Sequence, residues 1–304
     1  MSSLAKRARH GSSLDASKLE EATLTNPART ISTEEVGANG GERRSNRFVE
    51  AFARGLSVVR AFGPDAPEMS LARIAERTGL TRANVRRILL TLVELGYIQQ
   101  DGKMFRLRPQ ILDLGYSYLS SASLPRVAQP IMEDVTARLQ MPCNLSVLQG
   151  DDVIVIGRVA ARRTIDVGLD LNIGRRFPAY ITPMGRLLLA GLPEGELGAY
   201  LAKACLRRLT ARTVVDPAEL RRIIIADLAK GWSLVDQEHS ELISSLAVPV
   251  TDASSRVAAT LSIGWTHGDL GRDEAVVSFL PVLKEAAAEV SRFMQMGSHQ
   301  RLSA

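Results

Sequence analysis

Cysteine is scarce in this chain, and long apolar runs are missing from it. Only two of its 304 residues are cysteines, Cys143 and Cys205, and they lie far apart in the sequence. This spacing argues against a disulfide framework and against a zinc knuckle, and it favours a reducing cytoplasm. No apolar run approaches the roughly 18–20 residues that a membrane-spanning helix needs. Because the first fifteen residues also lack an apolar segment, we expect neither a secretory signal nor a membrane partner.

Motifs that carry catalysis or cofactor binding are missing as well. The sequence has no Gly-x-Ser-x-Gly, His-Glu-x-x-His or phosphate-binding loop, and its glycines form no dinucleotide fingerprint. The run Asp236-Gln-Glu-His239 places acids beside one of only four histidines, as a metal site or a catalytic triad would require. A single histidine in an α/β domain is more commonly a packed or solvated group. We therefore expect no enzyme activity, no metal and no cofactor, and we keep an enzyme acting on a small carboxylate as the alternative.

Length and charge indicate two globular modules of different character. At about 100–200 residues per domain, a chain of 304 residues suggests two domains. Residues 48–110 carry 10 basic and 6 acidic side chains, whereas residues 111–304 carry 20 and 21. A basic module that precedes a nearly neutral one predicts a polyanion partner for the first module. A solvated charged surface would give the same numbers, so the choice depends on a motif.

The ends of the chain read as tails. Residues 1–44 are rich in Ser, Thr, Ala, Gly and charge without an apolar period, so we predict a disordered tail there and a second tail over residues 299–304. Order is expected to begin near Ser45 or Asn46, either of which could cap a first helix. Apolar residues at helical spacing follow, up to Gly63-Pro64.

The next segment has the element order of a winged helix-turn-helix. Ser70 is placed to cap a helix that ends at Gly79, and Thr81 is placed to cap another with a clean apolar stripe. Asp101-Gly102 then stands between two short alternating runs, which is a strong hairpin signal. The predicted order of elements is helix, helix, short turn, helix and two-stranded ribbon. This order predicts a winged helix-turn-helix over residues 45–108.

The helix that begins at Thr81 has the features of a DNA-recognition helix. Its basic face lies opposite the apolar stripe, and Arg82 and Arg86 share that face because they are four residues apart. In this motif the second helix enters the major groove, where Arg reads guanine and Asn reads adenine; a phosphate contact only positions the protein. The predicted DNA-binding residues are Ser70, Thr81, Arg82, Ala83, Asn84, Arg86, Arg87, Lys103 and Arg106.

Three more arginines, Arg43, Arg44 and Arg47, precede this module and are candidates for an arm in the minor groove. Two other interpretations stay open. The arginines could simply solvate a helix face, or the winged helix could bind another protein.

The rest of the chain changes to a mixed α and β pattern. Residues 109–122 predict a linker helix, and residues 123–298 predict a second domain. Thr182-Pro183 opens a helix there, because Pro is favoured at the first helical position. Further helices are expected over residues 126–140, 194–205, 216–229 and 272–296, and strands over residues 144–148, 153–159, 164–169, 246–250 and 256–264.

Several segments in one order resemble the IclR family of bacterial transcription regulators. Residues 70–97 (SLARIAERTGLTRANVRRILLTLVELGY) resemble its DNA-binding motif, and residues 176–192 (RFPAYITPMGRLLLAGL) resemble its effector-domain signature. Residues 231–239 and 246–250 fit its later segments. Residues 52–62 (FARGLSVVRAF) are similar to the subgroup that regulates aromatic-acid catabolism through the β-ketoadipate pathway.

The resemblance implies an α+β protein with a winged helix, a linker helix and a GAF-like α/β effector-binding domain. It implies a dimer or tetramer that binds double-stranded promoter DNA, with RNA polymerase as a further candidate partner. It also implies control of transcription by a small organic acid, in this subgroup an aromatic acid or a product of its ring cleavage.

The family also implies where this effector lies, between the concave face of a curved sheet and the helix that opens at Thr182. A helix N-terminus favours anions. Since Pro183 lacks an N–H, the amide contacts are expected from Met184 and Gly185. Carried over by position, the effector-binding residues are Leu169, Phe177, Tyr180, Pro183, Met184, Gly185, Ser245, Ser262 and Gly264.

Overall fold

The computed structural model describes residues 48–115, 123–161, 172–193 and 195–300. They belong to two compact units, one on each side of residues 116–122, and each unit is considered by itself. The predictions for residues 1–47, for the strand over 164–169 and for the second half of the linker helix lie outside the described residues. None of the described helices is long and apolar enough to cross a membrane.

The first unit is the predicted winged helix-turn-helix, with one strand more than expected. Its helices are α2 (Glu50–Arg60), α3 (Leu71–Thr78) and α4 (Arg82–Glu94). Its strands are β1 (Glu68–Ser70), β2 (Ile98–Asp101) and β3 (Met104–Leu107), in the order β1-β3-β2. The two-stranded ribbon is therefore a three-stranded sheet, because the three residues before α3 pair with β3.

Local signals for the helix-turn-helix are confirmed in detail. The Ser70 hydroxyl accepts the Arg73 N–H at the start of α3, and the Thr81 hydroxyl accepts the Asn84 N–H at the start of α4. Gly79 ends α3 with a φ of 67°, the left-handed conformation that glycine adopts without strain.

The first described helix is α2. It begins at Glu50 after Val49, which makes no side-chain capping bond, and the predicted caps Ser45 and Asn46 lie outside the described residues. Val58 is the buried residue of α2, whereas Phe52 on another face is 68% exposed. The helical spacing of apolar residues thus predicts α2 correctly. It also includes apolar side chains, such as Phe52, that do not pack in the core of this unit.

The predicted linker begins as a short 3-10 helix, η2 (Pro109–Ile111), and residues 112–115 continue as α-helix. The next described helix, α6 (Ser123–Leu139), belongs to the second unit.

The second unit is built on a six-stranded antiparallel sheet in the order β6-β5-β4-β9-β8-β7. These strands are β4 (Cys143–Gln149), β5 (Asp152–Val159), β6 (Arg176–Pro178), β7 (Ser233–Asp236), β8 (Ile243–Thr251) and β9 (Val257–Thr266). The edge strands β6 and β7 were not predicted, since three or four residues are too few to show an alternating pattern.

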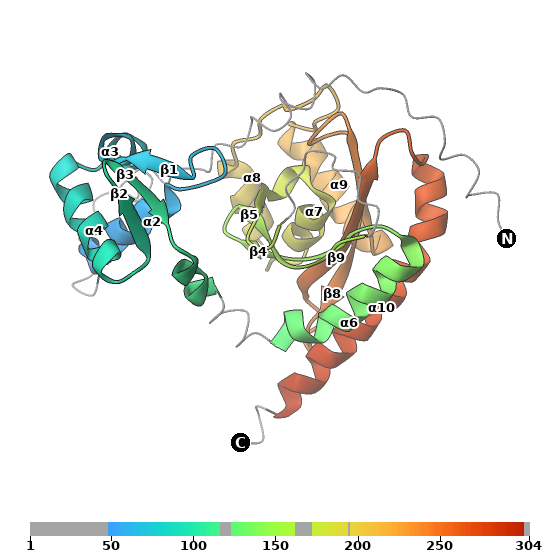
Figure 1. The fold of residues 1–304 in the computed structure, drawn as a ribbon. Helices are drawn as coiled ribbons and strands as arrows, with labels where there is room; N and C mark the ends of the chain where they lie inside the picture. Colours follow the sequence, from blue (N-terminus) through green and yellow to red (C-terminus); the bar gives the residue numbers. More distant parts are fainter. Residues whose placement is uncertain (1–47, 116–122, 162–171, 194, 301–304) are drawn as a thin grey trace. The chain divides into compact units, whose positions relative to one another are not determined.

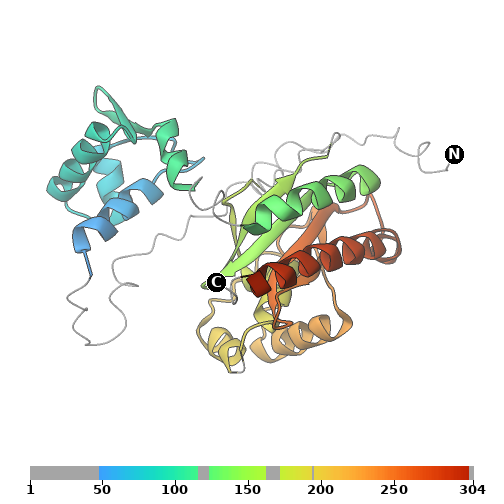
Figure 2. The same cartoon turned by 90° about the horizontal axis from the view of Figure 1, so that it is seen from below.

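Helices cover both faces of this sheet. α6 and α10 (Arg272–Gln300) lie side by side across one face, where they bury the larger apolar cluster (Figure 2). The sheet curls around α7 (Pro183–Ala190) on its other face (Figure 1), and α8 (Glu196–Lys203) and α9 (Pro217–Lys230) complete that layer. The expected mixed α and β architecture is confirmed.

Candidate DNA-binding surface and effector site

The α4 helix presents the basic face that its sequence predicts. Val85 and Leu89 are fully buried in the core of the first unit. The opposite side carries Arg82, Arg86 and Arg87, all exposed. Ala83 is exposed between them and Asn84 is half-buried. The buried stripe fixes the orientation of α4, so the arginines have to point to solvent.

The arginines of α4 have no acidic partner among the described residues, whereas three arginines of α2 and α3 do. Within residues 48–115, no ion pair forms at any of the three α4 guanidinium groups. By contrast, Arg54 pairs with Glu50 at 3.2 Å, Arg73 with Glu76 at 2.8 Å, and Arg77 with Asp65 at 2.7 Å. The hydrogen bond from Arg77 lowers the pKa of Asp65, which keeps that pair charged. The α4 guanidinium groups therefore have no internal acid within residues 48–115, a property they share with the other unpaired cations of this unit, Arg60, Lys103, Arg106 and Arg108.

The wing places further basic side chains at the surface. Gly102 turns the hairpin with a φ of 56°, and Lys103 at its tip and Arg106 on β3 are both exposed. Ser70 is half-buried, and its hydroxyl oxygen is used to cap α3. The predicted DNA-binding residues therefore gather on one unit, while Ser70 and Thr81 have an established structural role as caps. Arg43, Arg44 and Arg47 lie outside the described residues.

Most of the predicted effector residues surround α7. Phe177 on β6 is 3% exposed, Tyr180 4% and Met184 6%. Pro183 and Gly185 are buried in the first turn of α7. Leu169 lies outside the described residues.

The three predicted residues of the sheet share its α7-facing side. Ser262 on β9 stands opposite Ala247 of β8, which packs in the α7 cluster, and Ser245 stands opposite Gly264 two residues further along. Side chains two apart on a strand point to the same face. The structure thus brings Ser245, Ser262 and Gly264 together with α7, although Ser245 and Gly264 are only half-buried.

Hydroxyl groups without partners mark this face of the sheet. Ser262 is 1% exposed, and its Oγ has no hydrogen-bond partner among the described residues. The same holds for Ser146 on β4 and Thr260 on β9, which stand directly opposite each other. A buried polar group without a partner costs free energy, so such a cluster is typical of a site that a ligand completes. Ser146 and Thr260 were missed, and hydroxyls alternating with apolar residues in both strands were the available signal.

The start of α7 has fewer free backbone N–H groups for an anion than the sequence suggested. The Thr182 hydroxyl accepts the Gly185 N–H at 3.1 Å, and Pro183 has no N–H. This leaves the N–H of Met184 as the uncommitted amide of the first turn. Gly185 is required by space, because a Cβ there would lie 2.0 Å from the Ala179 carbonyl oxygen. The Tyr180 hydroxyl is also committed, since it donates to the Arg207 carbonyl and accepts the Arg207 N–H.

Two basic side chains that were not predicted flank Phe177. The Arg175 guanidinium lies 5.9 Å from the centre of the Phe177 ring, and the His239 imidazole meets the same ring edge-to-face at 5.5 Å. Burial lowers the pKa of His239, and the charge of Arg175 lowers that pKa further.

The acidic run before His239 is divided among separate partners. Asp236 pairs with Arg212 and accepts a hydrogen bond from Ser244 at 2.6 Å. Glu238 forms a buried ion pair with Arg186 of α7 at 2.7 Å. Asp236, Glu238 and His239 are thus held by different parts of the fold rather than gathered around one metal or nucleophile.

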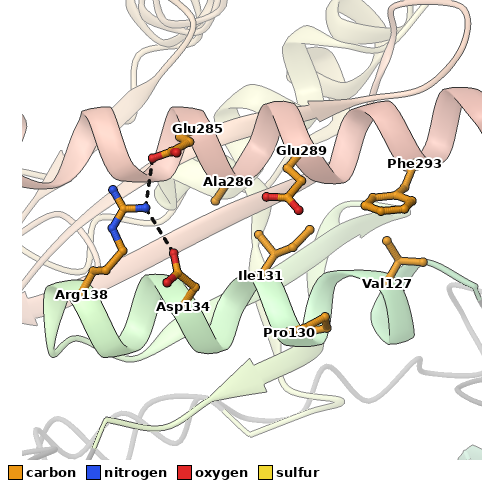
Figure 3. A pocket seen from close by; sticks show the side chains of 9 residues that line it. All are labelled: Val127, Pro130, Ile131, Asp134, Arg138, Glu285, Ala286, Glu289 and Phe293. Atoms are coloured by element: carbon orange, nitrogen blue, oxygen red, sulfur yellow. Dashed lines mark hydrogen bonds and ion pairs between the residues drawn. The ribbon is translucent and has the colours of Figure 1, made fainter.

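Two open hollows lie away from the predicted effector residues. One, of about 410 Å³, is lined by paired charges that include Arg186, Glu238 and Arg212. The other, of about 420 Å³, lies between α6 and α10, on the opposite face of the sheet from α7, and Arg138 closes one end by pairing with Asp134 and Glu285 (Figure 3).

Comparison with known sequences decides the family. The profile of the bacterial transcriptional regulator IclR C-terminal domain matches residues 116–292, and that of the IclR helix-turn-helix domain matches residues 51–102. The chain belongs to the IclR family. It is accordingly a DNA-binding regulator of transcription, and the IclR helix-turn-helix match contains all of α3, α4 and the turn between them.

Named IclR relatives and solved structures agree with this assignment. The chain is 40% identical over 243 residues to the Pca regulon regulatory protein of Pseudomonas putida, covering 80% of this chain and 83% of that protein. It is 30% identical over 252 residues to the p-hydroxybenzoate hydroxylase transcriptional activator of Acinetobacter baylyi, covering 82% and 93%. A putative transcriptional regulator from Rhodococcus sp. RHA1 superposes with a TM-score of 0.73 at 40% identity, covering 82% of this chain and 99% of that one.

An IclR homolog from Microbacterium hydrocarbonoxydans, crystallised in complex with 4-hydroxybenzoate, shares the fold. Its TM-score is 0.68 at 23% identity, and the match covers 81% of this chain and 99% of that one.

Proposed function

We propose that this IclR regulator controls genes of aromatic-acid catabolism in response to a small aromatic carboxylate. The named relatives regulate a Pca regulon and p-hydroxybenzoate hydroxylase, and a structural neighbour binds 4-hydroxybenzoate. In this chain the proposal rests chiefly on one observation, the buried and unpartnered hydroxyls of Ser146, Thr260 and Ser262 on the α7 face of the sheet. A ring hydroxyl of the effector supplies the missing hydrogen bonds, while Phe177 and Met184 supply apolar walls.

Promoter DNA is the second ligand, and the α4 face is its proposed site. Arg82, Arg86, Arg87 and Asn84 contact the major groove, and Lys103 and Arg106 of the wing contact phosphates. The absence of ion pairs at the α4 arginines within the described residues supports this assignment. An arginine without an internal acid can pair with a phosphate or a guanine at no cost in lost salt bridges.

Self-association completes the proposal. Phe48, Val49 and Phe52 are 45%, 65% and 68% exposed at the start of α2, and large apolar side chains gathered on a surface are typical of interfaces. Paired winged helices would match a palindromic operator. Sedimentation analysis of Phe52→Ser should show a shift toward monomer if this surface is used, and an unchanged assembly would place the interface elsewhere.

Titration calorimetry tests the effector assignment. The full-length protein is titrated with 4-hydroxybenzoate, protocatechuate and β-ketoadipate, and at least one aromatic acid is expected to bind. If none of the three binds, the subgroup assignment is wrong while the family assignment stands.

Variants of the sheet then locate the site. Ser262→Ala should weaken binding by about 1–3 kcal/mol, because the effector loses a buried hydrogen bond. Ser245→Ala tests the neighbouring residue predicted from the sequence. Ser254→Ala, in an exposed turn, is the control and should bind normally. Undiminished affinity in Ser262→Ala and Ser245→Ala would move the site elsewhere.

A further inference from the structure

The two sides of the segment that leads into β6 carry adjacent arginines with different surroundings. Arg176 points to Asp152, with its Nε 3.1 Å from the carboxylate, and it also donates to the Gln149 carbonyl. Arg175 and Phe177 are two residues apart and share the other side, where the guanidinium lies over the ring at 5.9 Å from its centre. The Nε of Arg175 is buried and has no hydrogen-bond partner among the described residues.

This cluster joins the two ends of the curled sheet. Phe177 lies on β6 at one edge, and His239 follows β7 at the other edge, yet their rings are in contact. The Phe177 ring is thus bordered by a guanidinium and an imidazole that come from opposite ends of the sheet. Both are within 6 Å of the ring centre.

The charges around this ring are unbalanced. Arg175 forms no ion pair with any described acid, and the influences on His239 are burial and Arg175 itself. Glu238, the acid next to His239 in sequence, is committed to Arg186 and to the Val214 N–H. Arg175 is half-buried, and its buried Nε without a hydrogen-bond partner among the described residues costs free energy that an anionic ligand would remove.

We propose that Arg175 and His239 bind the carboxylate of the effector beside the Phe177 ring and thereby set the preference of the site for acids over neutral aromatics. This inference rests on the proposed function and adds the residues that recognise the charged end. The first turn of α7 is less suited to bind the carboxylate, because Pro183 has no N–H and the Gly185 N–H is already donated to the Thr182 hydroxyl. Arg175 supplies the charge and a planar donor edge, and the neutral imidazole of His239 supplies one N–H.

A matched pair of ligands and a matched pair of variants test this assignment. The ligands are 4-hydroxybenzoate and 4-hydroxybenzamide, which differ in charge but little in shape. The variants are Arg175→Gln and Arg176→Gln, which remove the same charge from opposite sides of one segment. Calorimetry on the full-length protein gives both affinities for each variant.

In the wild type the acid should bind roughly tenfold or more tightly than the amide, as expected for a hydrogen-bonded charge pair. Arg175→Gln should lower the affinity for the acid by about that factor and change the affinity for the amide little. Arg176→Gln should keep both affinities. His239→Gln, which retains an N–H donor, should show a smaller loss confined to the acid.

Each contrary result has a separate meaning. Equal losses for acid and amide in Arg175→Gln would assign Arg175 a purely structural role and overturn the inference. An unchanged preference for the acid would also overturn it and leave the proposed function intact. If the wild type binds no aromatic acid, the proposed function fails and this inference fails with it. Should Arg175→Gln not fold, Arg175→Lys keeps the charge and is expected to retain the preference for the acid at reduced affinity; loss of that preference would count against the inference.

Discussion

The α4 face of the winged helix and the α7 region of the effector unit hold arginine in opposite ways. On α4 of the winged helix, Arg82, Arg86 and Arg87 are exposed and form no ion pair within the described residues. In the effector unit Arg186 is 2% exposed and is held by Glu238 and by the Tyr180 carbonyl. An arginine without an internal acid is available to an external anion, whereas one paired with a buried acid is committed to the fold.

Arg175 of the effector unit also has no described acidic partner. Unlike the exposed unpaired arginines of that unit, it is half-buried, and its Nε is buried without a hydrogen-bond partner among the described residues. This combination is why we propose that it binds a ligand.

Breaking the buried ion pair between Arg186 and Glu238 should have the largest effect on the free energy of unfolding. Arg186→Met leaves the Glu238 carboxylate buried without its cation, and this should lower the free energy of unfolding by about 3–5 kcal/mol. Chemical denaturation of the effector unit within the full-length protein measures the loss. Arg256→Met removes an exposed pair with Asp252 and should cost less than about 1 kcal/mol. A loss at Arg186 as small as that at Arg256 would show that the buried pair does not hold α7.

The close approach of α7 to the segment before it should give the next largest effect. Gly185→Ala places a Cβ 2.0 Å from a backbone oxygen of Ala179, so unfolding should become easier by about 1–3 kcal/mol or more. Gly198→Ala on α8 meets nothing within 4 Å and should stabilise its helix by roughly 0.5–1 kcal/mol. Thermal unfolding of the two variants gives opposite signs. If Gly185→Ala melts like the wild type, the packing of α7 against Ala179 is looser than described.

The wing should make a smaller and non-selective contribution. Lys103→Ala should weaken binding to all DNA sequences alike and reduce the salt slope by about one, because a phosphate contact carries no base information. Fluorescence anisotropy on operator and random duplexes at several salt concentrations measures both quantities. A loss confined to the operator would make Lys103 a base-reading residue instead.

The smallest effect concerns pH. The folded pKa of His239 lies below its ordinary value of 6.5, so the unfolded chain binds more protons than the folded one just below that pH. Stability is therefore complete above about pH 6.5 and declines as the pH falls through the window down to the folded pKa. His239→Gln should reduce this decline and match the wild-type pH dependence above pH 7. An identical decline in the variant would assign it to other groups.

Local structure could be predicted from the sequence where a short-range signal fixes it. Capping by Ser70 and Thr81, the helix start at Thr182-Pro183 and the turn at Gly102 were all predicted correctly, because each depends on a few adjacent residues. The short strand β1 was missed, since its three residues acquire strand geometry only by pairing with β3.

The site was less accessible to sequence reasoning because its geometry depends on long-range pairing. Phe177 and Ser262 were predicted from a family resemblance, and the structure places both on elements around α7. The pairing of Ser146 with Thr260 depends on the register between β4 and β9. The contact of Phe177 with His239 depends on the curl of the whole sheet, which no local pattern encodes.

DNA recognition by the α4 arginines is tested most sharply by the affinity of α4 variants for an operator. This operator is selected from random duplexes by the wild-type protein. Arg82→Ala and Arg86→Ala should each lose about 1–3 kcal/mol if they read bases, and their salt slopes should fall. Arg54→Ala, which removes an arginine already paired with Glu50, should bind like the wild type. A folded Arg82→Ala/Arg86→Ala double variant with unchanged operator affinity and salt dependence would show that α4 is not the DNA-binding helix.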